Sequence, residues 1–125
     1  MKRETTREKK LGVIESRFAD IVWSNAPLGT TELVKICEQE LNWKRTTTYT
    51  VLKRLSDHGL FQYKSGLVTV VMTREEFYSK QSEIFVNENF DGSLPAFLAA
   101  FASRKKLSKE DVSEIKKLID SYEEE

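Results

Sequence analysis

The amino-acid sequence predicts a mainly α-helical fold with one small β-hairpin. Two patterns predict this fold class: apolar residues recur at helical spacing in six segments, and two β-rich runs flank a short glycine-containing turn after the third segment. With 39% hydrophobic and 32% charged residues, the 125-residue chain has the composition of a globular protein. A chain of this length buries enough surface to fold without a disulfide or a structural metal.

The first three segments carry the start and stop signals of short helices. Their ranges are residues 11–23, about 30–42 and about 45–58. Pro27 lies beyond the end of the first segment, and Gly59 directly follows the third, where a glycine commonly ends a helix.

A hairpin is expected next, because residues 60–63 and 67–72 are β-rich and are joined by the turn Lys64-Ser65-Gly66. Three short helices followed by a hairpin form the winged helix-turn-helix pattern. The sequence therefore predicts a winged helix over residues 11–73, preceded by a basic N-terminal arm over residues 1–10.

Three further helices are expected in residues 74–125, and the first opens with the capping box Thr73-x-x-Glu76. Their large apolar residues are too many for about fifty residues to enclose alone. We therefore expect a three-helix dimerisation domain whose apolar face is covered by a second copy of the chain. The expected dimer-interface residues are Phe77, Ile84, Phe85, Leu94, Phe97, Leu98, Phe101, Ile115, Leu118, Ile119 and Tyr122.

The sequence offers little for catalysis or metal binding. His58 lies beside the helix-ending Gly59, where a contact with the helix end is more common than a role as general base. The single cysteine, Cys37, falls on the apolar stripe of the second helix and is best interpreted as a small core residue. No phosphate-binding loop, histidine–carboxylate metal motif or nucleophile elbow is present. We expect no enzyme activity, no metal and no cofactor.

The charges are unevenly distributed along the chain. Residues 1–80 carry a net charge of +4, and residues 81–125 carry −4. This asymmetry suggests that the N-terminal part faces an anion such as nucleic acid. No apolar run is long enough to span a membrane and no hydrophobic segment follows the charged N-terminus, so a cytoplasmic protein without membrane contact is expected.

The third predicted helix carries the most informative pattern, because its polar face lies opposite an inward face that contains Thr48, Val51, Leu52 and Leu55. Threonine hydroxyls can bond base edges and their methyl groups can contact thymine, while cations pair with phosphates. The predicted base-reading residues are Thr46, Thr47, Tyr49 and Thr50. The predicted phosphate-contacting residues are Lys44, Arg45, Lys53 and Arg54, with Lys64 in the hairpin turn.

Other interpretations of this pattern stay open. The β-branched run could form a strand, although Leu52 and Leu55 continue the helical spacing. The polar face could be a solvated surface without a ligand, and the hairpin turn could be a plain turn. The whole domain could also be a winged helix that docks a protein rather than DNA, on the third helix or on the C-terminal apolar helices.

Short motifs spread in order over residues 11–122 point to a known family. They are Ile21-Val22-Trp23, Pro27-Leu28, Trp43, Leu52, Arg54-Leu55, Gly59-Leu60, Gly92-Ser93-Leu94 and Leu107-Ser108. In this order and spacing the chain resembles the penicillinase-repressor family of BlaI/MecI/CopY-type transcriptional repressors. The resemblance implies a homodimer that binds palindromic operators in double-stranded DNA, often built around TACA and TGTA halves, and that represses antibiotic-resistance or metal-homeostasis genes.

The resemblance also places site residues and a regulatory route on this chain. It assigns base reading to Thr46, Thr47, Tyr49 and Thr50, and a phosphate contact to Arg54. The family usually has longer cationic side chains at the positions of Thr46 and Tyr49, so a different operator preference is expected. In the beta-lactam branch a sensor–protease pathway cleaves an Asn-Phe bond, and the matching bond here joins Ala100 and Phe101. Two roles stay open for Phe101, a regulatory cleavage site and a core residue.

Overall fold

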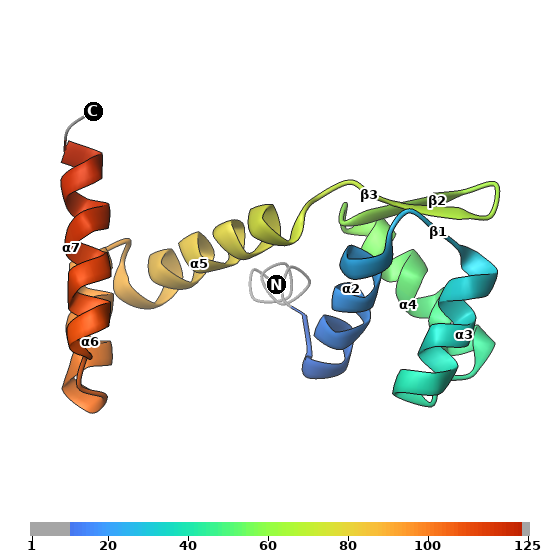
Figure 1. Cartoon of the computed structure of the whole chain (residues 1–125), viewed down its shortest axis with the longest axis horizontal. Coiled ribbons are helices and arrows are strands. Elements are labelled where there is room, and N and C mark those ends of the chain that lie inside the picture. Colours follow the sequence, from blue (N-terminus) through green and yellow to red (C-terminus); the bar gives the residue numbers. More distant parts are fainter. Residues whose placement is uncertain (1–10, 124–125) are drawn as a thin grey trace. The chain divides into compact units, whose positions relative to one another are not determined.

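The computed structural model describes residues 11–123 (Figure 1). These residues divide into two compact units between Ser82 and Glu83. We call them the N-terminal unit and the C-terminal unit. Helix α5, Arg74–Phe90, contributes its first half to the N-terminal unit and its second half to the C-terminal unit. Each unit is described by itself below.

The N-terminal unit consists of three helices, a small sheet and the first half of α5. In chain order its elements before α5 are α2 (Val13–Asn25), β1 (Leu28–Gly29), α3 (Thr30–Leu41), α4 (Arg45–Asp57), β2 (Phe61–Lys64) and β3 (Leu67–Val70). The strands form an antiparallel sheet in the order β1-β3-β2, with Leu28 opposite Val68 and Phe61 opposite Val70. The predicted fold class, a winged helix-turn-helix followed by a helical segment, is confirmed.

Two backbone conformations set the ends of the helices that carry the site. Helix α3 ends because Asn42 adopts a left-handed conformation with φ 56°, which asparagine tolerates better than most residues. Helix α4 ends at Asp57: the backbone N–H of His58 donates to the Arg54 carbonyl, and Gly59 follows with φ 86°. The predicted end of the third helix is therefore correct to within one residue.

The core of the N-terminal unit is formed by one apolar face from each helix and the inner face of the sheet. Its fully buried large side chains are Phe18, Val22, Leu33, Leu52, Leu55, Phe61 and Val68. Trp23 closes one side: its indole Nε1 donates to the Met72 carbonyl oxygen at 3.0 Å, and its ring centroid lies 5.7 Å from that of Phe61. Aromatic pairs of this kind stabilise a core beyond the area that they bury.

Phe77 lies in this core and not on a free surface. Its side chain is only 5% exposed in the single chain, and its ring centroid lies 5.9 Å from that of Trp23. Arg74 and Asp20 form an ion pair of 3.2 Å beside it, which also ties the start of α5 to α2. The expectation that Phe77 faces a second copy is therefore corrected, because the N-terminal unit has already covered it.

The C-terminal unit contains the second half of α5 and the helices α6 (Leu94–Arg104) and α7 (Lys109–Glu123). Ser93 caps α6 by accepting a hydrogen bond from the Ala96 N–H, and Ser108 does the same for the Asp111 N–H near the start of α7. Side chains in residues 83–122 are exposed or half-buried, and none of them is buried.

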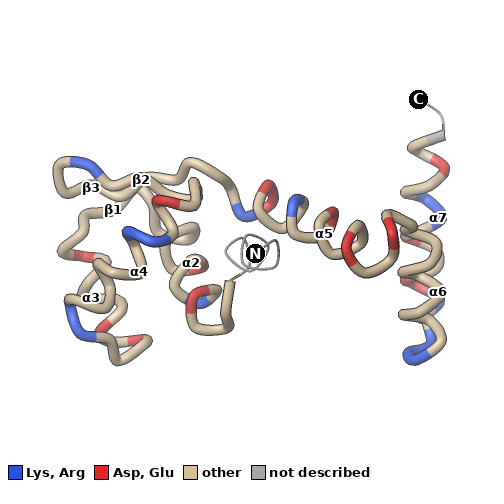
Figure 2. Tube along the Cα trace, turned by 180° about the vertical axis from the view of Figure 1, so that it is seen from behind, with Lys and Arg blue, Asp and Glu red and all other residues tan. Residues whose placement is uncertain are grey.

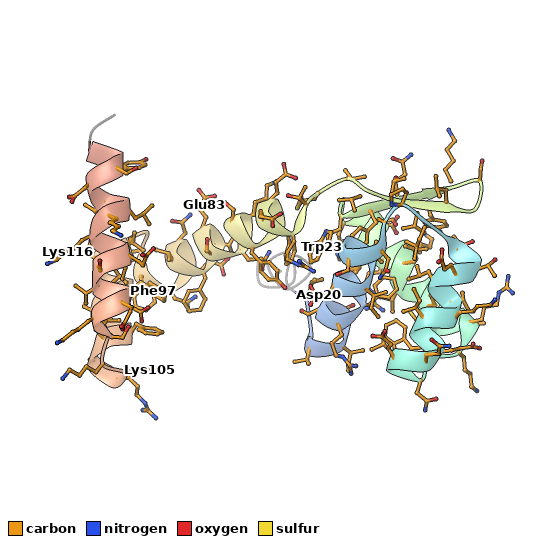
Figure 3. All side chains as sticks on the ribbon, in the orientation of Figure 1. Asp20, Trp23, Glu83, Phe97, Lys105 and Lys116 are labelled. Carbon is orange, nitrogen blue, oxygen red and sulfur yellow. The ribbon has the colours of Figure 1, made fainter. Side chains whose placement is uncertain are left out.

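Four phenylalanine rings gather in the C-terminal unit. The ring centroids of Phe85 and Phe97 lie 6.0 Å apart, those of Phe90 and Phe97 lie 5.6 Å apart, and Phe101 lies 6.3 Å from Phe97. Phe97, labelled in Figure 3, is therefore the centre of this cluster. Even so, Phe101 remains 47% exposed, and further along the unit Leu118 is 69% exposed.

The capping box at the start of α5 predicts a pH-dependent contribution to stability. The Thr73 N–H donates to the Glu76 carboxylate and the Glu76 N–H donates to the Thr73 hydroxyl oxygen, at 2.8 and 3.1 Å. The backbone hydrogen bond from Thr73, followed by its side chain, lowers the pKa of Glu76 below its usual value. A carboxyl group with a lowered pKa stabilises the fold at neutral pH, and this contribution is lost as pH falls through that pKa.

We therefore expect Glu76→Gln to lower the free energy of unfolding at pH 7 and to have a smaller effect at about pH 3. Urea unfolding at the two pH values measures both effects. Glu75→Gln removes the same charge from the neighbouring position and serves as the control. An equal loss at both pH values would show that the ionised form of Glu76 contributes nothing specific.

Candidate nucleic-acid interface

Helix α4 is held in place by a fully packed inner face. Thr48, Val51, Leu52 and Leu55 are all buried, as the sequence predicts. The segment that leads into α4 is fixed by Trp43, whose ring stacks on Phe18 with a centroid distance of 5.6 Å. Threonine and valine are poor helix formers in isolation, so this packing is what stabilises the helix.

The outer face of α4 carries the predicted base-reading residues together. Thr46, Thr47 and Thr50 are exposed and Tyr49 is half-buried. The cations Lys44, Arg45, Lys53 and Arg54 are exposed on or beside the same helix, and Figure 2 marks cations in blue. The structure thus places short polar side chains and cations on one solvent-facing helix, as expected from the sequence.

Local contacts orient three of these side chains. The Thr50 hydroxyl donates to the Thr46 carbonyl oxygen at 2.9 Å, so its hydrogen is engaged by the helix backbone and its methyl group remains for contact with a ligand. The Lys53 ammonium pairs with Asp57 at 3.1 Å. The Arg45 guanidinium carbon lies over the Tyr49 ring, 5.6 Å from its centroid. The pair Lys53–Asp57 is well exposed, so it contributes little to stability.

Arg54 has a partner that sequence reasoning missed. Its guanidinium forms an ion pair with the Glu15 carboxylate on α2, and the other oxygen of Glu15 accepts a hydrogen bond from the Gly12 N–H at 3.2 Å. The Arg54 side chain stays 50% exposed. Glu15 and Arg54 are 39 residues apart in the sequence, so no local pattern could have revealed the pair.

The hairpin turn is tied to the start of α3. The Thr30 N–H donates to the Gly66 carbonyl oxygen at 2.9 Å, next to the short pairing of β1 with β3. Ser65 and Gly66 both have positive φ, 54° and 78°, which lets the strands turn within two residues. Lys64 is exposed at the end of β2, so the turn presents one cation beside Ser65.

Cys37 lies in the core beneath α4. Burial raises the pKa of its thiol, and the neighbouring Thr48 side chain opposes this shift in part. A buried thiol with a raised pKa is a poor nucleophile, which agrees with the interpretation of Cys37 as a core residue.

Across residues 11–123 no helix is both long and apolar enough to cross a membrane. The same residues contain no group of three or more histidine, cysteine, aspartate or glutamate side chains placed to hold a metal ion.

A comparison with protein families identifies the chain. The model of the penicillinase repressor family matches residues 11–121, which include α4, the hairpin, α5, α6 and most of α7. This chain belongs to the penicillinase repressor family. The chain is also similar to the penicillinase repressor of Bacillus licheniformis, with 24% identity over 112 residues that cover 86% of this chain and 88% of the relative. Membership of this family indicates a regulatory protein that represses transcription rather than an enzyme.

Proposed function

We propose that this penicillinase-repressor family member is a homodimeric repressor that reads a dyad-symmetric DNA operator with α4. The observation that supports this most strongly is the division of α4 into a buried face and a polar face. The buried face fixes the helix, so the exposed threonines and tyrosine can enter a major groove without rearranging the core. Family membership supports the same function.

In this proposal some residues of the polar face contact bases and others contact phosphates. Thr46 and Thr47 are exposed and can offer their hydroxyl groups to bases, whereas Thr50 presents its methyl group, which suits a thymine. Tyr49 completes the base-reading set. Phosphate contacts come from Lys44 just before α4, from Lys53 and Arg54 in α4, and from Lys64 in the hairpin turn. These contacts supply affinity and orientation, and the base contacts supply sequence preference.

The proposed dimer forms through the C-terminal unit. Exposed aromatic and aliphatic groups there lack cover in the single chain, and a second copy is the partner that carries a matching surface. The proposed interface residues are Ile84, Phe85, Leu94, Phe97, Leu98, Phe101, Ile115, Leu118, Ile119 and Tyr122. Two-fold symmetry then requires an operator with two half-sites about one helical turn apart.

We propose that repression is relieved by a change in the C-terminal unit. The bond between Ala100 and Phe101 lies inside α6, and both residues are exposed. If a sensor–protease pathway acts on this protein, cleavage of that bond would separate Phe97 from Phe101 and detach α7 from the rest of the interface. This proposal links the loss of repression to the loss of the dimer.

DNA binding tests the proposed function directly. We expect full-length protein to bind duplex DNA from upstream of its own gene more tightly than a scrambled duplex, and to keep this preference near physiological salt, because base contacts do not depend on counterion release. Fluorescence anisotropy at low and near-physiological salt measures it. Equal binding to both duplexes that disappears with salt would contradict the proposal and favour a winged helix that docks a protein.

The Glu15–Arg54 pair allows a test of the phosphate contact. We expect Glu15→Gln to tighten binding to both duplexes, by up to about fivefold, since it frees Arg54 for a phosphate at the cost of a partly exposed ion pair. Arg54→Ala should weaken both alike and reduce the salt slope by about one.

The control for Glu15→Gln is Glu38→Gln, which removes the same charge from an exposed position of α3. Similar tightening by both variants would show that only net charge matters. A change in sequence preference caused by Arg54→Ala would show that Arg54 reads bases.

A further inference from the structure

Arg45 and Tyr49 form an arranged pair on the outer face of α4. Arg45 is the first residue of the helix and Tyr49 follows one turn later, so both lie on the same side. The guanidinium carbon of Arg45 lies 5.6 Å from the centroid of the Tyr49 ring, within the range of a cation–π contact. Within residues 11–123, no carboxylate forms an ion pair with Arg45.

This contact orients the guanidinium without using its hydrogen-bond donors. A cation–π contact places the cation over the face of the aromatic ring and does not take up the N–H donors of the guanidinium. The planar fork matches the O6 and N7 acceptors that guanine presents in the major groove. An aromatic support also reduces the rotamer freedom that the long side chain would lose on binding.

The position of this pair on α4 favours a base, rather than a phosphate, as the DNA group that Arg45 contacts. The first turns of a recognition helix contact base edges, and Tyr49 lies among the proposed base-reading residues Thr46 and Thr50. A guanidinium that rests on Tyr49 is therefore directed toward the bases, whereas the sequence alone suggests a phosphate contact for Arg45. Resting on the function proposed above, we propose that Arg45 is a specificity-determining residue that reads one guanine in each half-site, positioned by Tyr49.

The probe for the test is a duplex selected from a random DNA pool by the full-length protein. Each guanine is then replaced in turn by 7-deazaguanine, which lacks N7, or by inosine, which keeps the major-groove edge and loses only the minor-groove amino group. We expect one 7-deazaguanine position per half-site to weaken wild-type binding by about fivefold to a hundredfold, and inosine there to have little effect.

Variants of Arg45 and Tyr49 then test whether these two residues cause the sensitivity to 7-deazaguanine. Arg45→Ala should bind the natural and the 7-deazaguanine duplex equally, and Tyr49→Ala should lose most of the difference between them. Tyr49→Phe keeps the ring and should retain the difference. Arg104→Lys, an exposed arginine at the end of α6, is the control and should behave like wild type. Circular dichroism confirms that each variant is folded.

Three outcomes separate this inference from the proposed function. If selection yields no preferred sequence, the proposed function itself fails. If a preferred sequence emerges but no guanine is sensitive to 7-deazaguanine, or if Arg45→Ala keeps the sensitivity, Arg45 does not read guanine. If Arg45→Ala instead weakens all duplexes alike, including a scrambled one, Arg45 contacts phosphate and the inference is overturned.

Discussion

The single chain leaves the apolar side chains of residues 83–122 without a buried core. These side chains remain exposed or half-buried although the unit carries four phenylalanines, and Tyr122 near the end of α7 is 78% exposed. Apolar area left in water forfeits about 25 cal/mol for each Å², so such a surface favours association strongly. The proposed symmetric operator and the proposed route to derepression both follow from this constraint, because each requires two copies joined through the C-terminal unit.

The N-terminal unit, in contrast, packs a buried core within the single chain. It buries its own core completely and leaves a polar helix face unburied, so it can bind a ligand as a preformed surface. The threonines of α4 contribute little helix propensity, and the packing of Leu52 and Leu55 compensates for this weakness. A stable scaffold with a locally unfavourable sequence on its outer face is typical of a recognition surface.

Most of the fold could be predicted from the sequence, because helical spacing, capping residues and glycine positions are local signals. The ends of α3 and α4 and the capping box at Thr73 follow from such signals. Strand β1 could not be predicted, since two residues show no alternation and its pairing with Leu67 and Val68 is distant in sequence. Phe77 was assigned to the wrong surface because periodicity reveals an apolar face but not what covers it.

The candidate site could be predicted in composition but not in its contacts. The spacing of α4 identified which residues face outward, and burial of Thr48 confirms that register. The ion pair between Glu15 and Arg54 arises only from the packing of α2 beside α4, so nothing local to either residue indicates it. Arg45 and Tyr49 lie one helical turn apart, so a contact between them could have been anticipated. The role proposed for Arg45 depends on the position of its guanidinium over the Tyr49 ring, which spacing alone does not give.

Sedimentation velocity of the full-length protein at micromolar concentration tests the dependence on a second copy most directly. The wild type should sediment as a dimer, and Ile119→Lys should shift it toward monomer because a charge then lies in the proposed interface. Ser121→Lys adds the same charge two residues away on α7 and should leave the dimer intact. A wild-type protein that sediments as a monomer would contradict the account.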